Sequence, residues 1–153
     1  MRLINQSFEI WNQPAGLEGV YKQIERVGRV CYKSEDKITE NSAKPFVDRM
    51  IKSSHGAMLE HGTIYLAMPM ETILSIEANG WDKYTKNPYS KGFKVYEVDG
   101  QRRVAITTNL RVLVENGWLD DLQYICEPTE YHERRVTVHF VCDRGVSHKK
   151  FVA

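Results

Sequence analysis

The stretch KVYEVDGQRRVAI, residues 94–106, carries the strongest short-range structural signal in the sequence. Asp99-Gly100 stands between two runs rich in β-branched and aromatic residues, and this dipeptide favours a two-residue turn between antiparallel strands. We therefore predict a β-hairpin here. Segments with helical periodicity lie on both sides of it, so the sequence indicates an α+β fold in which helices pack on a β-sheet.

The helices are predicted from apolar residues that recur at intervals of three and four. This pattern runs from Leu17 to Cys31, enough for about four helical turns. A second stripe runs from Phe46 to Ile51, with Pro45 near its first turn and Gly56 as its expected stop. Further short helices are predicted at residues 71–79, 109–116 and 119–125.

Residues 135–142 alternate between an apolar face and a second, more polar face, and this alternation predicts a strand. The apolar face consists of Val136, Val138, Phe140 and Cys142, and the other of Thr137, His139 and Val141. We expect this strand to lie in one sheet beside a buried strand at residues 63–68, with residues 2–11 forming an edge strand or two short ones. Asp143 is expected to cap a helix that begins at Gly145.

Composition restricts the class of protein. The chain has 153 residues, 42% of them apolar and 27% charged, and a net charge of +1. These values predict a single domain over residues 1–153. The balanced charge gives no electrostatic footprint for nucleic acid, although a small anionic ligand needs only two or three cations. No apolar run reaches the ~20 residues of a membrane span, and the amino terminus lacks a secretory pattern. We expect a cytoplasmic protein that binds neither nucleic acid nor membranes.

The three cysteines, Cys31, Cys126 and Cys142, are odd in number and form no CxxC pair. Reduced thiols in a cytosolic protein account for this pattern. A catalytic cysteine is the alternative, but none of the three has a basic partner at a recognisable spacing. We therefore assign no catalytic residue.

The segment HGAMLEH, residues 55–61, places two histidines and a carboxylate where a helix gives way to a strand. Side chains in such a connection can converge on a ligand. The six-residue separation does not put both imidazoles on one helical face, unlike the pair in HExxH, so no metal site is assigned. A hydrogen-bonded structural turn is the alternative interpretation.

The segment RVCYKS, residues 29–34, ends the first predicted helix with two cations and two hydroxyl groups. Cations stabilise the carboxyl terminus of a helix, where the helix dipole is negative, so a solvated helix end is one interpretation. The other is the wall of a nucleotide or flavin pocket. GxGxxG, P-loop and GxSxG motifs do not occur in the sequence, and the residues alone specify no catalytic group.

These two segments, followed by DRGVSH at residues 143–148, occur in the order that is found in flavin-dependent thymidylate synthases, and the chain resembles that family. The resemblance implies part of the thymidylate synthase-complementing protein fold, with residues 71–133 as an insertion carried by one subgroup. It also implies a homotetramer that converts dUMP to dTMP with FAD, NADPH as reductant and methylenetetrahydrofolate as one-carbon donor. Such chemistry needs no protein nucleophile, because the cofactor carries the reaction.

The resemblance also implies roles for particular residues. Ala57 stands where the family often has a hydroxyl residue, and a backbone contact to flavin would survive that change. The implied FAD-binding residues are Cys31, His55, Ala57, Glu60 and His61, and the implied substrate-binding residues are Lys150 and Ala153.

The family's Arg-His-Arg-x-x-Ser signature would follow the last residues of this sequence, which does not contain it. Its arginines would hold phosphate and pyrimidine groups. We therefore expect a truncated chain that binds FAD weakly or not at all and makes no dTMP by itself. The alternative is a non-catalytic remnant that binds flavin or nucleotide, or an assembly module.

Overall fold

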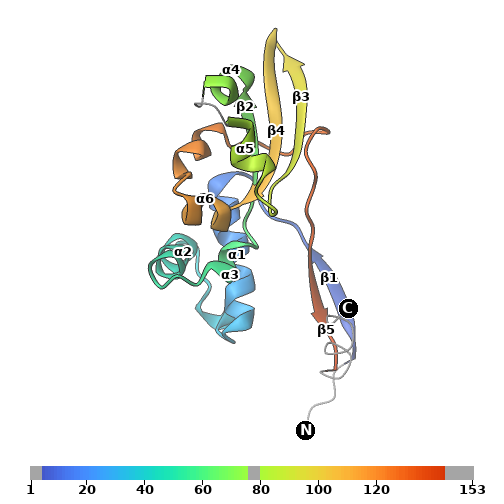
Figure 1. Cartoon of the computed structure of the whole chain (residues 1–153). Helices are drawn as coiled ribbons and strands as arrows, with labels where there is room; N and C mark the ends of the chain where they lie inside the picture. The colour runs from blue at the N-terminus through green and yellow to red at the C-terminus, as the bar shows by residue number, and fades with distance from the viewer. Residues whose placement is uncertain (1–4, 76–79, 144–153) are drawn as a thin grey trace. The chain divides into compact units, whose positions relative to one another are not determined.

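A computed structural model of the chain describes residues 5–75 and 80–143 (Figure 1). Helices and antiparallel sheets occur together in these residues, which confirms the α+β class. The chain divides into two compact units, one of residues 13–135 and one of residues 1–12 with 136–153. The expectation of a single domain stays a prediction.

The larger unit contains a three-stranded antiparallel sheet in the order β2-β4-β3. Its strands are β2 (Thr63–Pro69), β3 (Lys91–Val98) and β4 (Gln101–Asn109). Asp99 and Gly100 join β3 to β4 with φ values of 50° and 73°, the left-handed backbone that a tight hairpin turn requires. The predicted hairpin is therefore confirmed.

Two long helices and several short ones accompany this sheet. The predicted helix at residues 17–31 is confirmed as α1 (Gly16–Cys31), and the second predicted helix is α2 (Ala43–Lys52). Gly56 does not end α2 but begins α3 (Gly56–Leu59), so the expected stop was wrong. The remaining elements are η1 (Glu35–Lys37), α4 (Met70–Ser75), α5 (Gly80–Thr85), α6 (Leu110–Asn116) and η2 (Leu119–Tyr124).

Three of these short elements can be compared with helices predicted from the sequence. α6 confirms the helix predicted at residues 109–116, and the side chain of Asn109 caps it by accepting a hydrogen bond from the Val112 amide at 3.0 Å. η2 is a 3₁₀ helix where residues 119–125 were predicted to be helical. α4 covers the first part of the predicted 71–79 helix, and residues 76–79 lie outside the described residues.

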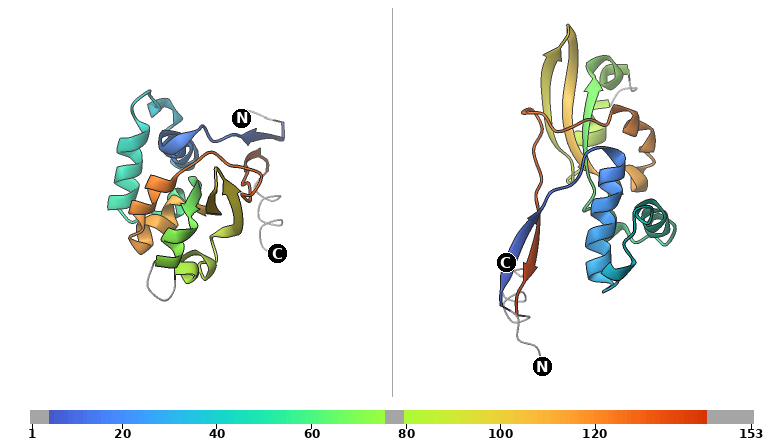
Figure 2. Two further views of the ribbon diagram at one scale, coloured as in Figure 1. Left: turned by 90° about the horizontal axis from the view of Figure 1, so that it is seen from above. Right: turned by 180° about the vertical axis from the view of Figure 1, so that it is seen from behind.

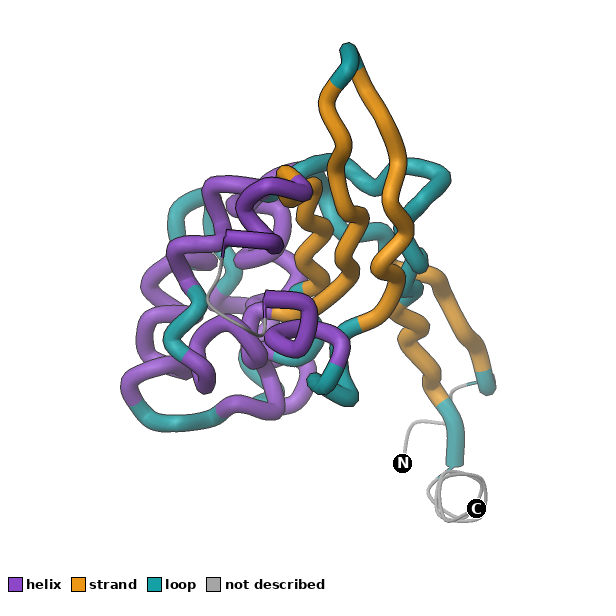
Figure 3. Tube along the Cα trace, turned by 45° about the horizontal axis from the view of Figure 1, so that its top comes forward, coloured by secondary structure: helices purple, strands orange, loops and turns teal. Residues whose placement is uncertain are grey.

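The core of the larger unit lies between the helices and one face of its sheet (Figure 3). Ile24 of α1, Phe46 of α2 and Leu66 of β2 all belong to this core and are almost fully buried. A Cβ atom on Gly28 of α1 would lie 2.5 Å from the Phe46 ring, so the close crossing of α1 and α2 depends on this glycine. On the opposite face of the sheet, Ala67, Tyr96 and Ala105 form a smaller cluster with Cys126 and Tyr131.

The smaller unit contains an antiparallel two-stranded sheet of β1 (Ser7–Trp11) and β5 (Thr137–Val141), which lie side by side in the right view of Figure 2. Phe8 is paired with Phe140, and the ring of Trp11 stacks on that of His139 at 4.5 Å. The two strands were predicted, but the expectation that residues 135–142 lie beside 63–68 was wrong. Alternation predicts the two faces of a strand and contains no information about its neighbour.

No helix in the described residues is long and apolar enough to cross a membrane. The helix predicted from Gly145 lies outside the described residues.

Candidate functional site

A groove of about 690 Å³ lies at the carboxyl ends of α1 and α2. We call it the α1–α2 groove. It combines aromatic, apolar and basic side chains, and no Asp or Glu lines it. Its lining residues are Arg29, Tyr32, Ser34, Phe46, Arg49, Met50, Lys52, Ser53 and His55.

Both helices reach the groove through the same kind of turn. Lys33 follows α1 with φ 48°, and the amides of Lys33 and Ser34 donate to the carbonyls of Val30 and Arg29. This pattern of two bonds is a Schellman motif. Ser54 repeats it after α2, with φ 57° and with the same two bonds from Ser54 and His55. Because the backbone reverses direction within three residues after each helix, side chains from the two helix ends are brought together.

Tyr32 and His55 form the contact between these two turns. The hydroxyl of Tyr32 and Nδ1 of His55 are 3.1 Å apart, and the two ring planes are inclined by 28° with centroids 6.4 Å apart. Tyr32 belongs to the RVCYKS segment and His55 begins the HGAMLEH segment. The fold therefore joins two segments that lie about twenty residues apart in the sequence.

The charge of the groove comes mainly from α2. Arg29 is buried and already paired with Glu25, whose Oε1 accepts from its Nε at 3.1 Å. The guanidinium of Arg49 lies 5.8 Å from the centre of the Phe46 ring, and Lys52 is exposed one turn later. Arg49 and Lys52 are therefore the cations that remain for an anionic ligand.

The residues implied for FAD are only partly brought together. His55 lines the groove, whereas Cys31 at the end of α1 and Ala57 in α3 are exposed and do not line it. Glu60 and His61 do not line the groove with His55. Their assignment to FAD stays a prediction, and Lys150 and Ala153 lie outside the described residues.

Glu60 instead belongs to a charge cluster with α6. Its Oε1 accepts from Nη1 of Arg111, and Nε of the same guanidinium donates to Glu115 at 2.6 Å. A Cβ atom on Gly56 would lie 2.9 Å from the Arg111 Nε, so this glycine makes room for the guanidinium.

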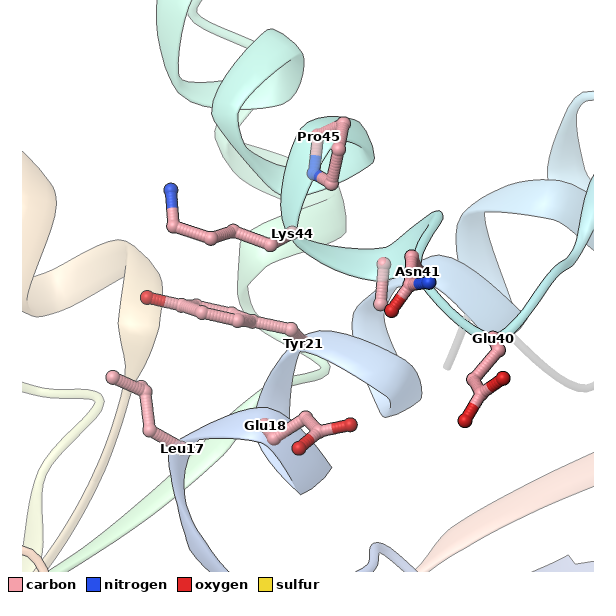
Figure 4. A pocket seen from close by; sticks show the side chains of 8 residues that line it. Leu17, Glu18, Tyr21, Glu40, Asn41, Lys44 and Pro45 are labelled. Carbon is pink, nitrogen blue, oxygen red and sulfur yellow. The ribbon is translucent and has the colours of Figure 1, made fainter.

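A smaller groove of about 480 Å³ lies near the first turns of α1 and α2 (Figure 4). Figure 4 shows the Tyr21 ring beside the Lys44 side chain. Lys44 pairs with Asp48 at 2.7 Å and Glu18 with Lys22 at 2.6 Å. Because two of its charged residues already have partners, this groove is the weaker candidate.

Cys126 and His132 approach each other, with Sγ and Nε2 3.8 Å apart. The Thr129 amide donates to Nδ1 of His132, so Nε2 carries the ring proton and donates to the Leu66 carbonyl at 3.0 Å. Burial raises the pKa of Cys126 and lowers the pKa of His132. A nucleophilic thiolate needs the opposite shift of the thiol, so this pair is structural.

A second buried cluster joins α5 to η2. Tyr84 donates to Oδ2 of Asp121 at 2.5 Å, and the same oxygen pairs with Lys83. Each group has a partner, which indicates a structural role. Among residues 5–75 and 80–143, no three His, Cys, Asp or Glu side chains gather into a possible metal site.

Sequence reasoning missed Arg49 and Lys52. Phe46, Arg49 and Lys52 recur at intervals of three, which places them along one side of a helix. That spacing was the available signal, but Phe46 was interpreted only as part of a core stripe.

No protein-family model matches the chain, and no curated protein or solved structure matches it either. The fold and the groove therefore define the class of this protein by themselves: an α+β protein with a basic, aromatic groove between two helix ends.

Proposed function

We propose that this chain serves flavin-dependent thymidylate synthesis and that the α1–α2 groove forms part of an FAD site. The observation that carries the proposal is the contact between Tyr32 and His55. It joins the two segments, RVCYKS and HGAMLEH, to which the family resemblance assigns flavin binding.

The chemistry of the groove suits part of a dinucleotide. Its volume of about 690 Å³ falls within the usual range for small-molecule sites. The exposed ring of Tyr32 offers a stacking surface for a planar ring. Arg49 and Lys52 offer charge-assisted hydrogen bonds to a pyrophosphate.

In the proposed reaction, bound FAD would relay the one-carbon unit of methylenetetrahydrofolate to dUMP, with NADPH as the source of reducing equivalents. The residues of the groove would bind and orient the cofactor. His55 would be held in one position by Tyr32, so that little ordering is needed when the ligand arrives. A homotetrameric assembly and a cytoplasmic location belong to the same proposal.

The groove is tested by titrating the purified chain with FAD and following the side-chain NMR signals of Tyr32 and His55. We expect weak, saturable shifts of both signals. Changing Arg49 and Lys52 together to glutamine should weaken binding by about tenfold or more, since each charge-assisted bond contributes about 1.5–3 kcal/mol. The matched control is Lys22→Gln, which removes an exposed lysine of α1 outside the groove.

If the signals of Tyr32 and His55 do not respond to millimolar FAD, the groove assignment is wrong. Equal affinities of the wild type and the double variant would also contradict it.

Catalysis is tested separately by tritium release from C5 of dUMP in the presence of FAD, NADPH and methylenetetrahydrofolate. We expect no release from this chain alone, because the arginine signature is not in its sequence. FAD binding without tritium release is therefore the expected outcome, whereas release would show that the chain carries out the reaction without the arginine signature.

A further inference from the structure

Arg135 is held firmly at the end of the segment that follows η2. Its backbone amide donates to the Tyr65 hydroxyl at 3.2 Å. Its guanidinium donates through Nη1 to the Thr108 carbonyl at 3.2 Å and through Nη2 to the Tyr89 carbonyl. These two bonds use two of the five N–H groups of the side chain, which leaves three for another acceptor.

This guanidinium has no counter-ion among the described residues, where its side chain donates only to backbone carbonyls. The situation differs from that of Arg29, which pairs with Glu25, and of Arg111, which pairs with two glutamates. Arg135 is half-buried, and burial lowers its pKa, so its charge is incompletely solvated. A charge that is partly removed from water is stabilised by an ionic partner.

Thr107 and Lys91 lie within two residues of Thr108 and Tyr89, whose carbonyls hold the Arg135 guanidinium. Tyr65, Thr107 and Lys91 are direct neighbours across β2, β4 and β3, so their side chains occupy the same face. Lys91 is exposed, and Thr107 is fully buried with a hydroxyl that has no hydrogen-bond partner. The Tyr65 hydroxyl holds the backbone of Arg135 beside this row.

We propose that Arg135 and Lys91 bind a phosphate group on this face of the sheet, with the Thr107 hydroxyl as a further partner. The planar fork of an arginine matches phosphate geometry, and the two carbonyl bonds fix the fork in advance. Because the site offers a second cation and a hydroxyl in addition to Arg135, a dianionic phosphate fits it better than a carboxylate with its single charge. The ligand is either inorganic phosphate or the phosphate group of an ester.

The test is a titration of the purified chain with inorganic phosphate at constant ionic strength, followed through the arginine Nε–H signals in NMR spectra. We expect the Arg135 signal to shift saturably. Arg135→Lys keeps the charge and loses the fork, so the affinity for phosphate should fall by about tenfold. Arg134→Gln is the matched control, and its affinity should stay within about twofold of the wild type.

Thr107→Val keeps Arg135 in place and is expected to weaken phosphate binding while circular dichroism shows an unchanged fold. This second variant keeps the proposal testable if Arg135→Lys unfolds. An unshifted Arg135 signal would overturn the proposal, as would equal phosphate affinities of the wild type, Arg135→Lys and Thr107→Val.

Titrations with dUMP and deoxyuridine then separate the two sources of phosphate. Tighter binding of dUMP than of inorganic phosphate, with no response to deoxyuridine, supports a phosphate ester. Equal affinities for dUMP and phosphate support free phosphate. These signals come from Arg135 and not from Tyr32 or His55, so this inference and the FAD proposal can fail independently.

Discussion

At the scale of single residues, the turns that build the α1–α2 groove use unusual backbone conformations. Lys33 and Ser54 occupy the left-handed region that glycine normally fills at the end of a helix. For a non-glycine residue, this conformation costs on the order of 1 kcal/mol. Both strained residues flank groove residues, as strained residues at binding sites often do.

This strain leads to a prediction about stability. Ser54→Gly should raise the free energy of unfolding by about 0.5–1 kcal/mol, because glycine adopts a positive φ without the steric cost of a Cβ. Urea unfolding measures the change. The control is Ser53→Gly, since Ser53 has a φ of −91° and its hydroxyl donates to the Arg49 carbonyl at 2.7 Å.

The control variant should be less stable than the wild type, so the two neighbouring substitutions are expected to act in opposite directions. A loss of stability in Ser54→Gly would mean that the side chain at this position contributes more than the backbone strain costs.

At the scale of elements, α1 and α2 position the groove through their close crossing at Gly28. Phe46 of α2 fills the space that a side chain at this position would occupy, and the same ring lines the groove. Packing of the core and the shape of the groove therefore depend on one contact.

Gly28→Ala should move the Phe46 ring, because the new methyl carbon would lie 2.5 Å from it. Overpacking of this kind costs about 1–3 kcal/mol of stability. This exceeds the stability gained from the higher helix propensity of alanine, which is about 1 kcal/mol. We expect a lower urea midpoint and a shifted Phe46 ring signal. Val27→Ala on the same helix is the comparison, and its Phe46 signal should stay in place. A more stable Gly28→Ala protein would contradict this prediction and show that α2 can move away from α1 without a loss of stability.

Sequence patterns predicted these elements well wherever a local physical cause determines them. The periodicity of residues 17–31 follows from burial of one helix face, and Asp99-Gly100 follows from turn geometry. The end of α2 was placed wrongly because Ser54, not a glycine, adopts the left-handed conformation. The partner of β5 was placed wrongly because strand pairing depends on contacts distant in sequence.

The candidate site was predictable only in part. The two segments around His55 and Arg29 were recognised, but their contact through Tyr32 depends on the Schellman turns, which have no glycine to mark them. Arg135 stands beside Arg134 in a polar stretch of the sequence, and nothing in this pattern distinguishes it from a solvated surface cation. Its partial burial and its lack of a counter-ion within residues 5–75 and 80–143 arise only when Tyr65, Tyr89 and Thr108 are brought around it.

At the scale of the whole molecule, His132 links the segment after η2 to the sheet of the larger unit through the Leu66 carbonyl. Burial lowers the pKa of this histidine below its usual value of 6.5. The unfolded chain therefore binds a proton more readily than the folded chain. The stability that His132 contributes is present above pH 6.5 and is lost as the pH falls through the lowered pKa.

The wild type should therefore have a lower urea midpoint at pH 5.5 than at pH 7.5. His132→Gln keeps a donor and an acceptor but cannot ionise, so its two midpoints should differ less. An equal loss of stability in the wild type and the variant would assign the acid sensitivity to other groups.

The hairpin turn has a consequence for protein engineering. A Cβ atom on Gly100 would meet no atom within 4 Å, and the turn lies at the end of the hairpin farthest from α2 in Figure 1. Insertions at such open tips are usually tolerated. Lengthening the two-residue loop to about ten residues costs only about 1–2 kcal/mol in closure entropy. An affinity tag or a fluorescent reporter could therefore be inserted between Asp99 and Gly100 while both grooves stay open to ligands.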